Sequence, residues 1–234
     1  MPAQRTPMII LLGLTLVGFL AIGVFAWPQL ACEGQPINNN EAPTQAQQIR
    51  GELIIGQSFL APRDDLNRID IMVQTYRRRN THDVTLRLLE VPEGAGNPLE
   101  GLEVYQTTFN ASTVRDQAWL TFRLPQISDS GGKRYLIALQ SPESDDGNAI
   151  TVGGIEQNVY LPGSAFLGPT PVLADITFRT CYQLTTFEKL QVLTGQLTRQ
   201  RPGVWGHGLF YGVSLLVYSL LLIGFFWKLT KLKV

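Results

Sequence analysis

The sequence predicts a mainly β protein, an antiparallel two-sheet sandwich of jelly-roll type flanked by two transmembrane α-helices. Three observations lead to this prediction. Two apolar stretches without charged residues stand near the two ends of the chain, and short alternating segments separated by turn-forming residues fill the region between them. Charged residues make up only 16% of the 234 residues, and the two apolar stretches explain why this fraction lies below the ~25% typical of soluble domains.

The first apolar stretch covers residues 8–27 and reads MIILLGLTLVGFLAIGVFAW. A helix of about 20 apolar residues is long enough to cross a bilayer core of about 30 Å. We therefore expect a transmembrane helix after a short tail, residues 1–7. A cleaved signal peptide is the alternative, because Val24 and Ala26 are small residues at the spacing of a cleavage site. The length of the stretch favours the uncleaved helix.

The second apolar stretch covers residues 208–227 and is followed by a tail, residues 228–234, that contains three lysines and no acid. Basic residues next to a span tend to remain in the cytoplasm. We therefore expect a two-pass integral membrane protein with both termini cytoplasmic and the middle of the chain exoplasmic. Gly208 and Gly212 form a small-xxx-small pair that would let another transmembrane subunit approach closely.

The region between the two stretches shows the period-two alternation of β-strands. Ile69, Ile71 and Val73 alternate with Asp70 and Gln74, which predicts a core face and a wetter face of one strand. We expect eight strands, near residues 52–60, 67–75, 83–91, 102–109, 118–124, 134–141, 149–153 and 173–182.

The residues around these strands divide into three regions. Residues 28–50 are polar and rich in Asn and Gln, which is typical of a linker. Residues 51–183 form the predicted sandwich. In residues 184–207 the period changes to that of an amphipathic helix. The sequence leaves three places open for this connector: the membrane surface, the surface of a partner, or the underside of its own domain.

The chain contains two cysteines, Cys32 and Cys181. In an oxidising compartment we expect them to form a disulfide that ties the end of the domain to its membrane stalk. Two reduced thiols are the alternative. A metal pair or a catalytic thiol is disfavoured because no further Cys or His accompanies them.

Candidate site residues are few. No catalytic or phosphate-binding motif is found in the sequence, so we do not expect an enzyme. Trp119 and Tyr105 are the aromatic residues best placed to stack on a sugar ring, although core packing is the common role of such residues. Asp145, Asp146 and Asn148 concentrate oxygen ligands in one loop, which suits either a structural calcium ion or a plain turn. No other cofactor is expected.

Charge excludes one class of partner. Between residues 28 and 207 the chain has 15 basic and 19 acidic residues, a formal charge of −4. Nucleic-acid binding requires a basic stripe, so we expect no nucleic-acid partner.

Several short segments carry a resemblance over residues 51–182. They are Gly56-Gln57-Ser58-Phe59, Trp119-Leu120-Thr121-Phe122-Arg123-Leu124-Pro125, Asp129-Ser130-Gly131-Gly132-Lys133-Arg134-Tyr135 and Asp175-Ile176-Thr177-Phe178-Arg179. With these segments the chain resembles exoplasmic β-sandwich domains of bacterial membrane proteins in envelope or polysaccharide assembly, and is similar in plan to galactose-binding-like and carbohydrate-binding jelly rolls. The resemblance implies a binding module at the bacterial plasma membrane.

Two functions fit this sequence. The first is a membrane-anchored, non-catalytic exoplasmic binding module for carbohydrate or an envelope polymer, with the lipid bilayer and a glycan as partners. The second is an accessory or structural subunit of a larger membrane protein complex. Fold resemblance does not choose between them, because function depends on the site and not on the fold.

Overall fold

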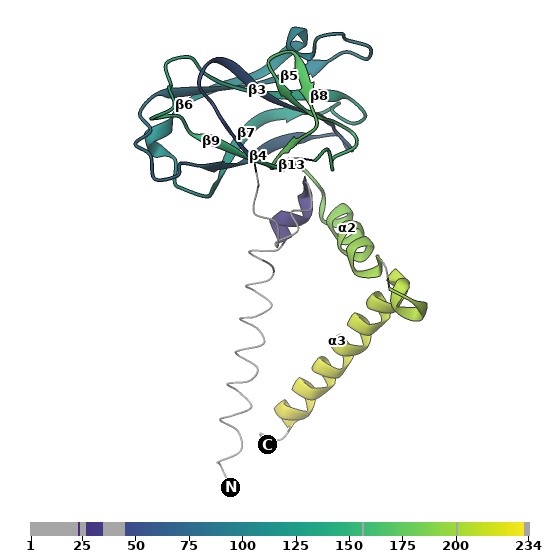
Figure 1. Cartoon of the computed structure of the whole chain (residues 1–234). Helices are drawn as coiled ribbons and strands as arrows, with labels where there is room; N and C mark the ends of the chain where they lie inside the picture. Colours follow the sequence, from purple (N-terminus) through teal and green to yellow (C-terminus); the bar gives the residue numbers. More distant parts are fainter. Residues whose placement is uncertain (1–22, 24–26, 35–44, 156, 200, 232–234) are drawn as a thin grey trace. The chain divides into compact units, whose positions relative to one another are not determined.

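The computed structural model describes residues 23, 27–34, 45–155, 157–199 and 201–231 (Figure 1). These residues belong to two compact units. One is Ala31–Gln183, and the other contains the described residues before and after it. Each unit is described by itself.

The unit Ala31–Gln183 consists of two antiparallel sheets, as the alternation predicts (Figure 1). The seven-stranded sheet has the order β1 (Cys32–Gly34), β13 (Phe178–Tyr182), β4 (Leu66–Gln74), β9 (Thr151–Ile155) and β12 (Asp175–Ile176), with β2 (Gln45–Gln48) on β9 and β7 (Ala118–Ile127) on β4. The six-stranded sheet has the order β11 (Thr170–Val172), β10 (Ala165–Leu167), β3 (Gly51–Leu60), β8 (Arg134–Ser141), β5 (Asp83–Val91) and β6 (Leu102–Asn110). Short 3₁₀ helices, η2 (Pro98–Glu100) and η3 (Ala111–Thr113), lie before and after β6.

The core lies between the two sheets. Ile69, Ile71 and Val73 of β4 are fully buried, which confirms the predicted core face of this strand. The ring of Phe59 on β3 lies 5.6 Å from that of Tyr135 on β8 and 5.8 Å from that of Phe178 on β13. Because β3 and β13 belong to different sheets, these aromatic contacts join the two layers.

A second apolar cluster covers the outer face of the six-stranded sheet. Its buried members are Leu89, Val91, Leu136 and Ala138, and partly buried side chains, Phe166 of β10 among them, pack against it. Leu136 and Ala138 alternate with the core residues of β8, so their side chains point away from the other sheet. Part of this face is therefore covered by Leu99 of η2 and by side chains of the strands themselves.

Three expectations about the strands are wrong in detail. The predicted linker contains β1 and β2, and β10 and β11 stand where no strand was expected. The predicted strand 173–182 is divided into β12 and β13 at Thr177. These elements have two to five residues, too few to show a period of two, and pairing with longer neighbours defines them.

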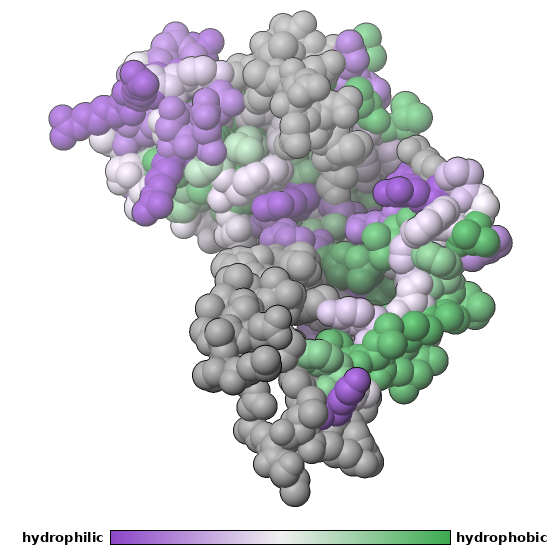
Figure 2. Space-filling view, turned by 90° about the horizontal axis from the view of Figure 1, so that it is seen from below, coloured by the Kyte–Doolittle hydropathy of each residue, from purple (hydrophilic) through white to green (hydrophobic). Residues whose placement is uncertain are grey.

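The C-terminal unit contains α2 (Thr186–Thr198), η4 (Gly203–Gly206) and α3 (Gly208–Lys231). A capping box between Thr185 and Glu188 begins α2, within the predicted connector. The hydroxyl of Tyr211 on α3 donates to the carbonyl oxygens of Leu197 and Trp205. Figure 2 shows apolar side chains, in green, gathered along these helices.

The two predicted spans have different outcomes. The first, residues 8–27, and its cleavage site fall almost entirely outside the described residues. The second coincides with α3, so its helix is present. None of the helices in the described part of the chain has both the length and the apolar content of a membrane span.

Candidate functional site

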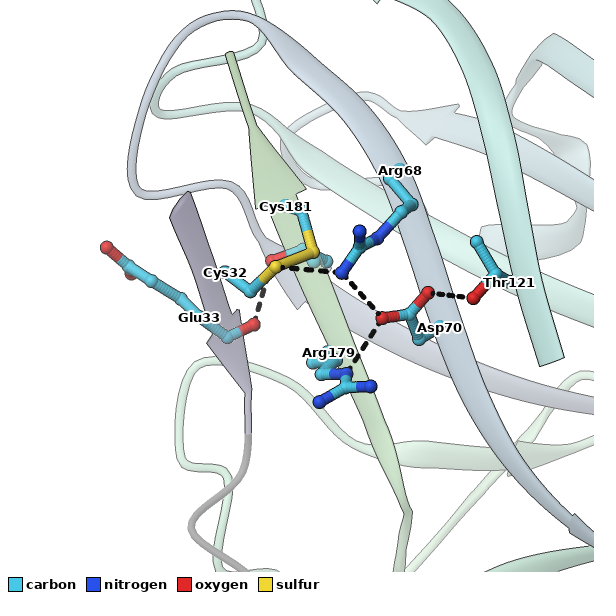
Figure 3. Close-up of polar contacts among 8 residues, drawn as sticks. Cys32, Glu33, Arg68, Asp70, Thr121, Arg179 and Cys181 are labelled. Carbon is cyan, nitrogen blue, oxygen red and sulfur yellow. Dashed lines mark hydrogen bonds and ion pairs between the residues drawn. A yellow bond between two sulfur atoms is a disulfide. The ribbon is translucent and has the colours of Figure 1, made fainter. Parts of the chain in front are cut away.

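A polar cluster stands on the outer face of the seven-stranded sheet (Figure 3). At its centre is Asp70 on β4, which is 0% exposed. One carboxylate oxygen accepts hydrogen bonds from Arg68 Nη2 at 3.1 Å and Arg179 Nε at 2.8 Å, and the other accepts from the hydroxyl of Thr121 at 2.8 Å. Two cations and a hydroxyl therefore hold one buried carboxylate.

Strand register explains how these residues meet. Asp70 lies directly opposite Arg179 on β13 and directly opposite Thr121 on β7. Directly opposed residues in an antiparallel pair point to the same side of the sheet, so the three side chains form a row across three strands. The wetter face predicted for Asp70 is the outer face, but arginine side chains cover the carboxylate there.

Removing one partner from this cluster would lower the stability of the folded domain. A carboxylate without access to water needs a paired charge and hydrogen bonds; both oxygens of Asp70 accept hydrogen bonds, and Oδ2 is paired with two guanidinium groups. Arg68 and Arg179 keep about a quarter of their side chains exposed, at 25% and 29%. The two guanidinium groups are thus held by a buried anion while part of each still meets solvent.

Trp119 belongs to the same face. It lies on β7 opposite Met72, and its side chain is half-buried. The guanidinium carbon of Arg179 stands 4.2 Å from the centroid of the indole ring, a close cation–π contact. Arg179 therefore connects the buried carboxylate of Asp70 to the aromatic ring.

Tyr105 does not join this cluster. It lies on β6 in the six-stranded sheet, opposite Leu88, whose side chain is in the core. The half-buried ring of Tyr105 is consequently on the inward side of a different sheet. The structure does not bring together the two aromatic residues that the sequence suggested for sugar stacking.

The expected disulfide is confirmed. Cys32 on β1 is bonded to Cys181 on β13 (Figure 3). Arg68 Nη2 also lies 3.1 Å from Cys32 Sγ, so the disulfide contacts the polar cluster directly. Next to it, the carboxylate of Glu33 pairs with Arg63 at 2.6 Å and holds β1 from its other side.

In the loop proposed for calcium, side-chain oxygens of Asp145 and Asn148 accept hydrogen bonds from backbone N–H groups of the same loop. Asp145 Oδ1 accepts from the backbone N–H groups of Gly147 at 2.8 Å and Asn148 at 3.2 Å, and Asn148 Oδ1 accepts from Asp145 N at 3.1 Å. Asp146 forms an ion pair with Arg50. In the described ranges no group of three or more His, Cys, Asp or Glu residues is arranged to hold a metal ion. These contacts are those of a plain turn, and calcium binding stays a prediction.

The sequence indicated only part of this site. Trp119 was singled out as an aromatic residue on a polar strand face, but Arg68, Asp70 and Arg179 were not. The available signal was Asp70 itself, a charged residue between Ile69 and Ile71 in a core strand. Recognising its partners requires the pairing of β4 with β13, and these strands are more than 100 residues apart in sequence.

Comparison with protein-family models finds no match for this sequence, and comparison with curated proteins finds none either. Any proposal about function therefore rests on the residues and the geometry described above.

Proposed function

We propose that the chain is a membrane-anchored, non-catalytic binding module on the exoplasmic side of a bacterial plasma membrane, and that it binds carbohydrate or an envelope polymer. The observation that carries the proposal is the indole of Trp119 held against Arg179 on the outer face of the seven-stranded sheet. Tyr105 is no longer part of the proposed site, because it lies in the other sheet.

The chemistry of this face suits a sugar. An aromatic ring offers an apolar surface to the C–H side of a sugar ring, and neighbouring guanidinium groups donate hydrogen bonds to hydroxyl oxygens. Asp70 fixes Arg179, and Arg179 contacts Trp119. A ligand would meet side chains that are already ordered, which lowers the entropic cost of binding.

The membrane part of the proposal rests on α3. Its exposed apolar side chains include Leu209 at 81% and Leu221 at 68%. Surfaces of this kind on soluble monomers are small, and larger ones mark interaction with lipid or protein. We propose that α3 and the apolar stretch 8–27 hold the chain in the bilayer, with both termini in the cytoplasm.

Glycan binding by the full chain in lipid nanodiscs tests the proposal. Saturable binding to one class of glycan on an array is expected, with a Kd at least about tenfold higher for Trp119→Ala, a loss of about 1.4 kcal/mol. Asp70→Asn removes the anion that fixes Arg179 and is expected to weaken binding while Trp119 remains. Tyr105→Ala is the matched aromatic control and should bind as the wild type does. Equal binding by wild type and Trp119→Ala would exclude this face as the site.

A second function, an accessory subunit of a membrane complex, is favoured by Gly212. A Cβ atom added at Gly212 meets no atom within 4 Å, so a neighbouring helix has room to approach there. At Gly208 an added Cβ lies 3.7 Å from the side chain of Thr194, so this glycine faces α2 instead. Co-purification of stoichiometric partners in mild detergent, reduced by Gly212→Leu, would support the subunit role.

A further inference from the structure

A cleft of about 430 Å³ lies on the outer face of the six-stranded sheet, away from Trp119. Ser58, Val91 and Phe166 contribute to its lining from the sheet. The loop segments 93–96 and 161–164 also line it. Its volume falls within the range of about 300–1,000 Å³ typical of small-molecule sites.

The wall formed by Leu161–Ser164 is fixed to β3 by its backbone. Ser58 N donates to Ser164 O at 2.9 Å, and Ser164 N donates to Ser58 Oγ at 3.0 Å. A Cβ atom at Gly163 would stand 1.9 Å from Ser58 O, so only glycine allows this approach. The wall therefore rests directly on the sheet.

A buried carboxylate fixes the start of the same wall. Asp175 is 1% exposed, and its Oδ2 accepts from the backbone N–H groups of Val159 at 2.7 Å and Tyr160 at 2.8 Å. Its Oδ1 accepts from Gln57 Nε2 at 3.0 Å, and Gln57 is itself fully buried. Burying a charge to hold a loop is costly, so the loop's position is strongly specified.

Arg134 places a cation at this cleft. Its Nη1 donates to Pro162 O at 2.6 Å, which fixes the guanidinium against the rigid wall. A guanidinium has five N–H donors, and within the described ranges Arg134 forms no ion pair with an acidic side chain. Its side chain is exposed. The arrangement is suited to an incoming carboxylate, which binds a guanidinium fork through two parallel hydrogen bonds.

We propose that this cleft is a second binding site, which takes a saccharide bearing a carboxylate group, with Arg134 as the partner of that carboxylate. Besides Glu93, the walls offer proline rings and backbone polar groups, which match the mixed apolar and hydroxyl surface of a sugar. An extended peptide fits less well, because the edge strand β11 contains Pro171, which lacks the N–H needed for strand addition. The proposal does not rest on the Trp119 face.

The test uses the full chain in nanodiscs and two forms of one probe, a galacturonic acid hexamer and the same hexamer with its carboxylates methyl-esterified. We expect saturable binding of the acidic hexamer by calorimetry and at least tenfold weaker binding of the ester. Arg134→Gln should lose at least tenfold in affinity for the acid, whereas Arg115→Gln, an exposed arginine outside the cleft, should change it less than twofold. Trp119→Ala should retain the binding, which separates this site from the first.

Gly96→Trp provides a second variant. Gly96 lines the cleft, and an added Cβ there meets no atom within 4 Å, so a side chain can start from this position without a clash, and a large one is expected to compete for the space of the cleft. Loss of binding in this variant, with an unchanged thermal midpoint, supports the site. Absence of binding by the wild type, equal affinity for the acid and the ester, or an unchanged affinity in Arg134→Gln would overturn the proposal. Binding of an acidic peptide in preference to the hexamer would also overturn it.

Discussion

At the scale of single residues, Tyr135 makes the stability of the domain depend on pH. Its side chain is fully buried, and its hydroxyl has no hydrogen-bond partner among the described residues. Burial, assisted by the charge of Glu90, raises the pKa of Tyr135 to about 12. A tyrosine in the unfolded chain has a pKa of about 10, so between these values the folded state keeps a proton that the unfolded state loses.

Stability is therefore expected to fall as the pH rises from about 10 to about 12, and this contribution is fully present below about pH 10. Tyr135→Phe removes it. At pH 7 the same variant should change the free energy of unfolding by less than about 1 kcal/mol, because it removes an unpaired hydroxyl. Urea unfolding at several pH values measures both effects. Tyr182→Phe is the control for the effect at pH 7 alone, since burial raises the pKa of Tyr182 as well. The Tyr182 hydroxyl donates to Thr180 Oγ1 at 3.1 Å, and its removal should cost about 1 kcal/mol at pH 7. A pH profile of Tyr135→Phe identical to that of the wild type would contradict the assignment.

At the scale of elements, the disulfide holds a short strand at the end of the seven-stranded sheet. β1 has three residues and, among the described strands, pairs with β13 alone, and the bond joins positions 149 residues apart. Closing so long a loop restricts the unfolded chain strongly, and we expect the double variant Cys32→Ser, Cys181→Ser to lose roughly 2–4 kcal/mol of stability. Urea midpoints with and without a reducing agent test this. The reductant should lower the urea midpoint of the wild type and leave that of the double variant unchanged. An unchanged midpoint of the wild type in reductant would show that the disulfide contributes little to stability.

Strands with many alternating residues were predictable, and short strands were not. The pattern of β4 identified its core face because Ile69, Ile71 and Val73 must all be buried together. By contrast, β2 consists of Gln45–Gln48, which has no apolar face and is a strand only because its backbone pairs with β9. The site follows the same division. The sequence alone identified Trp119 as an aromatic candidate. The contact between Asp70 and Arg179 depends on the register in which β4 pairs with β13, and no local sequence pattern contains that register.

At the scale of the whole molecule, the two compact units differ in secondary structure and in the exposure of their apolar side chains. All thirteen described strands lie between Cys32 and Tyr182, together with the buried core and the disulfide. The described residues after Gln183 form helices with exposed apolar side chains instead. The first unit therefore has what a domain needs to fold alone, and the second carries the exposed apolar side chains on which the proposed membrane anchor rests.

A chain cut to residues 31–183 should consequently fold, form the Cys32–Cys181 bond and unfold at the same urea midpoint as the domain in the full chain. Expressed in an oxidising compartment, it should be recovered without detergent. The full chain should stay with the membrane pellet after washing with alkaline carbonate, because apolar burial in lipid resists high pH and salt. Release of the full chain by carbonate would contradict the membrane anchor while leaving the binding proposal intact. Failure of residues 31–183 to fold with the disulfide formed would instead show that the helices contribute to the stability of the sandwich.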